Sequence, residues 1–192
     1  MQRTDFHVPY FLKRMKRRTA VILPKDIGAM IAYLGIGKEN DVVEIGGGTG
    51  FLTAYLSRIC RKVITYEKSE ESLEILESNV KKLEMGNVEI RFEDGKNAKE
   101  EADFYTIDSP DAMGILEGIK NNVRLGLVAY LPNMEQAKAF HIKCAESFDD
   151  VFTMTIEARE WEIDEKRSRP YHIQLVHTGF LTFARKSMKK ID

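Results

Sequence analysis

The stretch Asp41-Val-Val-Glu-Ile-Gly-Gly-Gly-Thr-Gly-Phe51 decides the fold of this chain. Residues 41–45 suit a short buried strand, four of the next five residues are glycines, and the apolar stretch 51–59 suits a helix. Glycines allow a tight turn and a close approach of the backbone to a ligand, which a Cβ atom would block. A glycine loop alone is a weak signal, because dinucleotide-binding enzymes use a related one. The stretch therefore predicts a strand, a turn that can receive a ligand, and a helix.

Strands and helices alternate on both sides of this unit. We expect strands at 41–45, 62–66, 88–92, 104–107 and 125–131, and helices at 25–34, 51–59, 112–122 and 134–148, with a further helix that Ser69 caps and Gly86 ends. This alternation favours α/β architecture with a doubly wound, mostly parallel sheet that has helices on both faces.

The last part of the chain has a different pattern. Two β-rich runs, 151–163 and 171–185, flank the charged segment 164–170. This pattern predicts five strand–helix units followed by a terminal antiparallel β-hairpin, with 164–170 as its loop. We divide the chain into a basic N-terminal arm, 1–23, and one domain, 24–192.

Three acidic residues follow or end predicted strands, where ligands bind in open α/β sheets. Glu44 precedes the glycines, and an acid there suits a cationic ligand better than a pyrophosphate. Glu67 ends the next strand, where a carboxylate can accept both ribose hydroxyls of an adenosine. Asp94 follows the third strand and could accept from an adenine amino group, although a turn residue is nearly as good an interpretation. Together with Gly46, Gly48 and Gly50, these acids predict a cofactor site.

Composition and charge limit the binding partners and the cellular location that we expect for this chain. The chain has 192 residues, 43% hydrophobic and 31% charged, with a formal net charge of −1. Residues 1–25 nevertheless carry seven Lys or Arg against one acid, which suggests either a local contact with phosphate or a frayed, solvated terminus. We expect no transmembrane segment and no secretory signal. Cys60 and Cys144 match no metal-ligand spacing, and we expect reduced cysteines, no metal and a cytoplasmic location.

Several segments, in this order, resemble the tRNA (adenine-N1)-methyltransferase family of class I S-adenosylmethionine-dependent methyltransferases. The likeness runs from about Arg17 to Lys186. It is carried by the segments Arg17-Arg-Thr-Ala-Val-Ile-Leu-Pro-Lys-Asp26, Glu44–Thr53, Tyr130-Leu-Pro-Asn-Met-Glu-Gln136, Arg169-Pro170 and His177-Thr-Gly-Phe-Leu-Thr-Phe-Ala-Arg-Lys186.

The resemblance implies a mechanism and a partner. Adenine N1 attacks the sulfonium methyl group of S-adenosylmethionine, and the enzyme must flip the base out and align it. The family's positioning aspartate corresponds to Asp108, whose competing interpretation is an N-cap for the helix 112–122. We assign tRNA contacts to Arg17, Arg18, Arg169 and His177, although His177 could instead hold its own loop by hydrogen bonds. The family's association into tetramers implies a homo-oligomer, a dimer or tetramer, with the hairpin as interface.

Two departures from the family pattern keep other functions open. Asp111-Ala112-Met113 stands where family members continue with a proline and an aromatic residue. Only the arm 1–23 precedes the core, where family members carry a small β domain. A methyltransferase for a small molecule or tetrapyrrole is therefore one alternative. The other is a non-catalytic partner subunit, against which the complete glycine loop and Glu67 argue.

Overall fold

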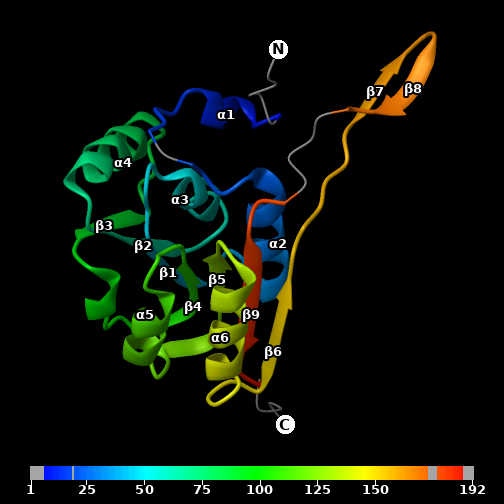
Figure 1. The fold of residues 1–192 in the computed structure, drawn as a ribbon. Coiled ribbons are helices and arrows are strands. Elements are labelled where there is room, and N and C mark those ends of the chain that lie inside the picture. Colours follow the sequence, from blue (N-terminus) through cyan, green and yellow to red (C-terminus); the bar gives the residue numbers. More distant parts are fainter. Residues whose placement is uncertain (1–6, 19, 173–176, 188–192) are drawn as a thin grey trace.

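A computed structural model describes residues 7–18, 20–172 and 177–187. Their helices surround a seven-stranded sheet, and a two-stranded sheet projects from this body (Figure 1). The helices are α1 (Tyr10–Lys13), α2 (Pro24–Leu34), α3 (Phe51–Leu56), α4 (Glu70–Lys82), the short 3-10 turn η1 (Gly95–Asn97), α5 (Ala112–Ile119) and α6 (Met134–Cys144). The strands are β1 (Asp41–Ile45), β2 (Lys62–Glu67), β3 (Val88–Phe92), β4 (Ala102–Ile107), β5 (Val123–Leu131), β6 (Asp150–Met154), β7 (Trp161–Asp164), β8 (Arg167–Pro170) and β9 (Phe180–Arg185).

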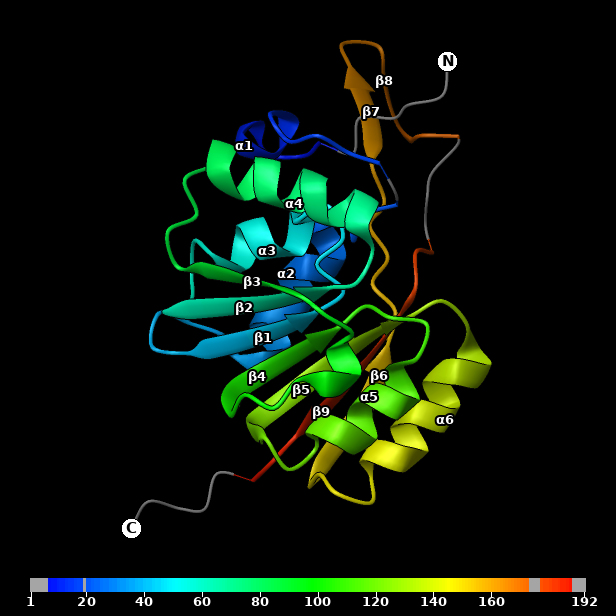
Figure 2. The same cartoon turned by 90° about the vertical axis from the view of Figure 1, so that its left-hand side faces the viewer.

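The large sheet has the order β3-β2-β1-β4-β5-β9-β6, and its first five strands are parallel. This confirms the predicted doubly wound, mostly parallel α/β fold. Helices α2, α3 and α4 lie on one face, and α5 and α6 lie on the other (Figure 2). Apolar side chains of β1, β4 and β5 alternate between the two cores, because successive residues of a strand point to opposite faces. The order reverses between β1 and β4, which places a switch point beside the glycine loop.

The predicted helix starts hold, and several predicted ends do not. The side chains of Ser69 and Asn133 accept from backbone N–H groups three residues further on, as N-caps do. Helix α3 ends at Leu56 rather than at residue 59. There the Nδ2 atom of Asn87 donates to the backbone oxygens of Ser57 and Cys60, each at 3.0 Å, so a side chain satisfies the carbonyls at the end of the turn. Helices α5 and α6 also stop early, at Ile119 and Cys144.

The two β-rich runs pair antiparallel, as predicted for the terminal hairpin, but the predicted bounds of its loop were wrong. β3 is followed by η1 instead of a full helix, so five complete strand–helix units do not form. β9 lies between β5 and β6 and pairs antiparallel with both, while the segment predicted as a loop, 164–170, contributes β8 to the projecting sheet. Burial explains why β9 takes an inner position of the large sheet. Leu181, Phe183 and Ala184 of β9 are fully buried. The more polar strands β7 and β8 pair with each other outside the large sheet. Residues 173–176 of the second run lie outside the described residues.

The described part of the arm packs on the body. Val8, Leu12 and Met15 are buried against α3 and Met85, so this part is not frayed. The buried Asn79 of α4 secures its end, because its Oδ1 accepts from the backbone N–H of Lys16 at 2.9 Å and its Nδ2 donates to the backbone oxygens of Lys16 and Thr49. Residues 1–6 and 19 of the arm lie outside the described residues.

Candidate active site

The glycine loop forms where β1 turns into α3. Gly46 has φ +91°, and a Cβ atom there would overlap the backbone oxygen of Asp108. The backbone N–H of Asp108 in turn donates to the backbone oxygen of Ile45 at 2.8 Å, so only glycine lets the ends of β1 and β4 lie this close. Gly48 has φ +54°, and open space lies where its Cβ atom would be. Gly50, at φ +84°, is the N-cap residue of α3. At Gly48 the loop therefore exposes its backbone, without a side chain, to open space that a ligand can occupy.

Glu67 organises this loop from the end of β2. Its carboxylate is 9% exposed and accepts three backbone N–H groups: those of Lys68 and Ser69 at Oε1, and that of Gly48 at Oε2, at 2.8, 2.7 and 2.7 Å. Each carboxylate oxygen can accept about two hydrogen bonds, so Oε2 keeps one lone pair for a ligand. The sequence predicted a ligand-binding acid here, and the geometry adds a second role, in which Glu67 holds the glycine loop to β2.

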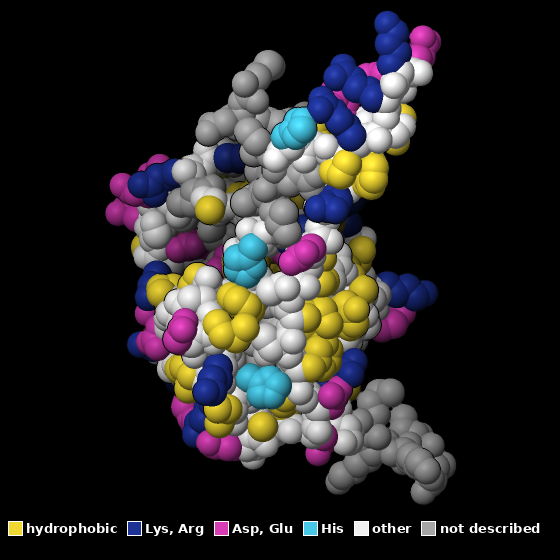
Figure 3. Space-filling model, turned by 45° about the vertical axis from the view of Figure 1, so that its right-hand side comes forward, with side chains coloured by type: hydrophobic (Ala, Val, Ile, Leu, Met, Phe, Trp, Pro, Cys, Tyr) yellow, Lys and Arg dark blue, Asp and Glu magenta, His cyan; other side chains and the backbone are white. Residues whose placement is uncertain are grey.

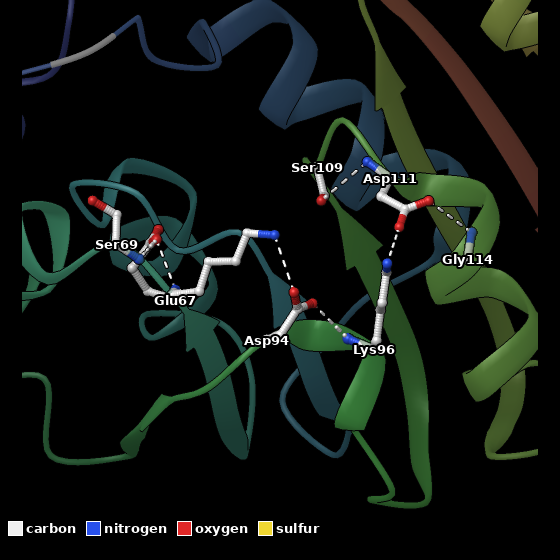
Figure 4. A network of polar contacts seen from close by, with 8 residues as sticks. Glu67, Ser69, Asp94, Lys96, Ser109, Asp111 and Gly114 are labelled. Carbon is white, nitrogen blue, oxygen red and sulfur yellow. Dashed lines mark hydrogen bonds and ion pairs between the residues drawn. The ribbon is translucent and has the colours of Figure 1, made fainter.

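Asp94 lies across from Glu67 and begins η1. Its Oδ1 accepts from the backbone N–H of Lys96 at 3.1 Å, and its Oδ2 pairs with the Nζ atom of Lys68 at 3.0 Å (Figure 4). These two hydrogen bonds, with the Lys96 N–H first, hold the pKa of Asp94 below its ordinary value. The turn-residue interpretation of Asp94 is therefore realised. Its predicted adenine contact stays a prediction and would use the lone pairs that these two bonds leave free.

Asp108 follows β4 and lines the same hollow as Glu67, Lys68 and Asp94, which encloses about 410 Å³ with its open mouth included. Its side chain is exposed within the hollow, and among the described residues nothing donates a hydrogen bond to its carboxylate. Enclosure by the walls, with the nearby negative charge of Glu67 second, raises the pKa of Asp108 to about 6. The helix-cap interpretation does not apply, because the N-cap of α5 is Asp111, whose Oδ1 accepts from the N–H of Gly114 at 3.2 Å.

Glu44 lies apart from the hollow. It is 2% exposed, and its Oε2 accepts from the hydroxyl of Thr53 in α3 at 2.6 Å. Burial raises its pKa to about 7, against the opposing effect of the hydrogen bond from Thr53. A direct contact of Glu44 with the cofactor stays a prediction. In this structure Glu44 ties β1 to the helix that carries the glycine loop.

The four predicted RNA-binding residues lie outside the hollow. Arg17 places its guanidinium 4.7 Å above the ring of Phe51, and Arg18 pairs with Glu71. Arg169 pairs with Glu162 at 3.0 Å in the projecting sheet, whose tip gathers Lys and Arg side chains (Figure 3). The ring of His177 packs on that of Phe180 at 4.9 Å.

Sequence reasoning missed two charged groups here. Lys68 contacts two of the predicted acids, because its backbone N–H donates to Glu67 and its Nζ atom pairs with Asp94. The only signal for Lys68 in the sequence was its position next to Glu67. Asp111, which the sequence showed only as part of a departure from the family pattern, caps α5 and pairs with Lys96 (Figure 4).

A larger hollow, of about 550 Å³, lies between α1, the far end of α3 and the end of α4. It is lined by Arg14, Arg58 and Lys82 among apolar side chains and contains none of the predicted site residues. Within the described residues no three His, Cys, Asp or Glu side chains converge as metal ligands would. No helix of that part of the chain is long and apolar enough to cross a membrane.

A doubly wound sheet, a glycine loop at its switch point and an acid at the end of β2 define a class I methyltransferase, an enzyme that uses S-adenosylmethionine. The chain belongs to the tRNA (adenine-N1)-methyltransferase TrmI family. It is 36% identical to "tRNA (adenine(57)-N(1)/adenine(58)-N(1))-methyltransferase TrmI" of Methanocaldococcus jannaschii over 94% of this chain and 77% of that protein. It is 31% identical to "tRNA (adenine(58)-N(1))-methyltransferase TrmI" of Thermus thermophilus, over 92% and 73%.

A solved structure supports the same assignment. The tRNA (m1A58) methyltransferase TrmI from Aquifex aeolicus superposes with a TM-score of 0.78 at 30% identity, covering 92% of this chain and 74% of that one. The family model for protein-L-isoaspartate(D-aspartate) O-methyltransferase also matches, over residues 6–108. That match ends at Asp108 and covers the cofactor half, whereas the TrmI relatives match both halves.

Proposed function

We propose that this enzyme methylates N1 of an adenine in tRNA. The observation that carries the proposal is Asp108, a carboxylate without a hydrogen-bond donor among the described residues, at the carboxyl end of the sheet and in the same hollow as Glu67 and the glycine loop. The relatives at 31–36% identity bear the names of enzymes that perform this reaction on adenine 57 or 58.

The residues of the hollow fit S-adenosylmethionine. Gly46 lines the hollow, and Gly48 of the same loop has open space where a side chain would stand. Glu67 and Asp94 offer carboxylate oxygens suited to ribose hydroxyls and an adenine amino group. When bound, this cofactor supplies the methyl group as an electrophile on its sulfonium. We assign Gly46, Gly48 and Gly50 to the cradle, Glu67 and Asp94 to the adenosine part, and Glu44 to support of the loop from behind.

Asp108 has the properties that the acceptor side of the reaction needs. With its pKa at about 6, most of this carboxyl is ionised at pH 7, so it can accept a hydrogen bond from the N6 amino group of the target adenine. Such a contact would align N1 and stabilise the positive charge that the base acquires when N1 is methylated. Transfer to N1 needs no activated protein nucleophile.

Arg17, Arg18, Arg169 and His177 are the residues that we expect to contact tRNA. Arg18 and Arg169 are engaged in solvent-exposed ion pairs, which contribute little to stability and can be exchanged for phosphates. Because β6 is an edge strand and Trp161 and Ile163 of the projecting sheet are exposed, a second copy of the chain has a surface on which to pack, and we propose a homo-oligomer. We place the enzyme in the cytoplasm, with tRNA and with its two buried free cysteines.

The experiment is mass spectrometry of tRNA nucleosides after incubation with isotope-labelled S-adenosylmethionine. We expect labelled 1-methyladenosine with the wild type and none with Gly48→Val, because a branched side chain at positive φ would strain the loop and fill the ligand's space. Calorimetry on both proteins separates loss of cofactor binding from loss of transfer. Cofactor binding without label in any RNA nucleoside would overturn the proposal and favour a small-molecule acceptor. Absence of cofactor binding by the wild type would favour a non-catalytic partner subunit.

A further inference from the structure

A buried charged cluster joins three distant segments at the carboxyl end of the sheet. Asp26, at the start of α2, is 0% exposed. Its Oδ1 accepts from the Nζ atom of Lys25 at 2.8 Å, and its Oδ2 accepts from the hydroxyl of Thr178 at 2.7 Å. The Nζ atom of Lys25 also donates to the Thr178 hydroxyl and to the backbone oxygen of Ile156, both at 2.6 Å. We call these three side chains the Lys25–Asp26–Thr178 clamp.

The clamp uses its hydrogen-bonding capacity fully. An ammonium group has three donors, and Lys25 makes three hydrogen bonds. The Thr178 hydroxyl both accepts and donates. Burying an ion pair gives little net stability compared with apolar packing, so such a cluster is better suited to specifying one geometry than to strengthening the core. The geometry that it specifies is the relative position of α2, Ile156 and Thr178.

Ile156 and Thr178 lie on the two legs of the projecting arm, which is distinct from the N-terminal arm 1–23. The projecting arm comprises residues 155–172, with the strands β7 and β8, and the described residues 177–179; its outgoing leg continues from β6, and Thr178 lies on its return leg just before β9 (Figure 1). Both legs are therefore bound to the same lysine. Among the described residues, the clamp is what fastens both legs to α2.

Tyr130 connects the clamp with the active site. Its hydroxyl donates to the backbone oxygen of Thr178 at 2.6 Å, and its ring lies directly where a Cβ atom of Gly179 would be. Tyr130 follows Ala129, which pairs in register with Ile107, the residue before Asp108. Desolvation raises the pKa of Tyr130, and the negative charges of Asp26 and Asp108 add to this effect. None of the three clamp side chains lines the cofactor hollow.

We propose that the Lys25–Asp26–Thr178 clamp positions the acceptor side of the active site, by holding the base of the arm and Tyr130 in place beside Asp108. This inference rests on the proposed function, because the acceptor is taken to be the tRNA adenine. The clamp residues act through Tyr130 and the return leg and do not touch the reacting atoms. They should therefore affect the use of tRNA and leave cofactor binding unchanged.

Thr178→Val is the test, because valine keeps the shape and removes the hydroxyl that accepts from Lys25 and donates to Asp26. We expect kcat/KM for tRNA to fall about tenfold or more, since a buried charged partner is left short of a hydrogen bond, while the Kd for S-adenosylmethionine measured by calorimetry stays within twofold. The chain's single tryptophan, Trp161, is 53% exposed on β7 and reports on the arm without any assay of activity. Its fluorescence anisotropy should decrease in Thr178→Val as the arm loosens.

Three controls make the test decisive. Thr178→Ser keeps the hydroxyl and should preserve both kcat/KM and anisotropy, and Thr155→Val removes an exposed hydroxyl of the outgoing leg and should change neither. Tyr130→Phe should lower kcat/KM as well, and its effect should not add fully to that of Thr178→Val, because both changes release the same residue, Thr178, from its partners. Wild-type kinetics and anisotropy in Thr178→Val, or an equal loss of cofactor affinity, would overturn the clamp. If the wild type transfers no methyl group to tRNA, the proposed function fails, and the anisotropy comparison still decides whether the clamp holds the arm.

Discussion

Two carboxyl groups near the glycine loop have raised pKa values for the same reason and with different consequences. Protein atoms enclose both Asp108 and Glu44, which disfavours their charged forms. Asp108 faces a hollow that a ligand can enter, so its ionisation affects the reaction. Glu44 is sealed between β1 and α3, so its ionisation affects stability.

We expect Asp108→Ala to lower kcat by on the order of 100-fold, because in-line transfer is sensitive to misplacement of the acceptor, with cofactor affinity little changed. For the wild type, kcat/KM for tRNA should fall as the pH decreases through about 6, where the carboxyl becomes protonated and can no longer accept. Asp108→Asn should lack this pH-dependent step and stay slow if the negative charge matters. Full activity in both variants, measured on tRNA by methyl incorporation, would place the catalytic group elsewhere.

Glu44→Gln should change the dependence of stability on pH. The pKa of Glu44 is about 4.5 in the unfolded chain and about 7 in the fold, so the unfolded chain releases this proton first as the pH rises. The free energy of unfolding of the wild type should therefore decrease between pH 4.5 and 7, by about 3 kcal/mol from this group, and should be fully reduced above pH 7. Urea unfolding at pH 5 and pH 8 measures it. An equal decrease in Glu44→Gln, which can still accept from Thr53, would contradict this.

The acids at strand ends could be predicted because parallel strands end at one edge of a sheet, which brings Glu67, Asp94 and Asp108 together wherever their helices lie. The direction of Glu44 could not be predicted in the same way. Residues 42–45 are buried on both faces of the sheet, so the sequence contains no alternation to show which face Glu44 takes.

At the scale of the elements, the start of α5 distinguishes the two aspartates of the segment 108–111: Asp111 caps the helix, and Asp108 lines the hollow. Asp111 caps this helix, and the ion pair with Lys96, followed by the Gly114 N–H, holds its pKa below the ordinary value. Two aspartates three residues apart are indistinguishable as cap candidates by residue type. What separates them is that the helix begins at Ala112, as predicted, which makes Asp111 the residue directly before it.

Asp111→Ala should lower the midpoint of thermal unfolding by a few degrees, because an N-cap acceptor is lost. Asp111→Asn keeps an oxygen for the Gly114 N–H and should retain most of the stability. Differential scanning calorimetry at pH 7 compares the two. If Asp108→Ala lowered the midpoint and Asp111→Ala did not, the cap assignment would be wrong.

The projecting sheet shows where the predicted bounds of an element failed. The charged segment 164–170 was predicted as a loop, yet Arg169 and Arg167 of this segment face Glu162 and Asp164 in register. Cross-strand ion pairs and a loop have the same composition, so only pairing, which is a long-range property, distinguishes them. The main sheet was predictable because its signals, glycine turns and caps, are local.

On the scale of the whole molecule, a nearly neutral chain has a local excess of positive charge in its N-terminal arm, because residues 1–25 carry seven Lys or Arg against one acid. Arg17→Gln with Arg18→Gln should flatten the dependence of log affinity for tRNA on log salt concentration by about one and a half, if each contacts one phosphate. Filter binding between 50 and 200 mM salt measures the slope. The control removes the same charge from the opposite end of the sheet with Lys38→Gln and Lys120→Gln, and its slope should equal that of the wild type. Equal slopes in all three proteins would show that the arm is not a phosphate contact.

Asn79 has a thermodynamic consequence. The side-chain amide of Asn79 holds both the N-terminal arm, at Lys16, and the glycine loop, at Thr49. When one of these segments becomes disordered, the other therefore loses part of its support. Linkage is reciprocal: if cofactor tightens tRNA binding by some factor, tRNA must tighten cofactor binding by the same factor. We expect such positive cooperativity in the wild type and its loss in Asn79→Ala, measured by titrating each ligand in the presence and absence of the other. The tRNA site and the cofactor site would then behave as one binding unit, with a single buried side chain, Asn79, as the coupling element.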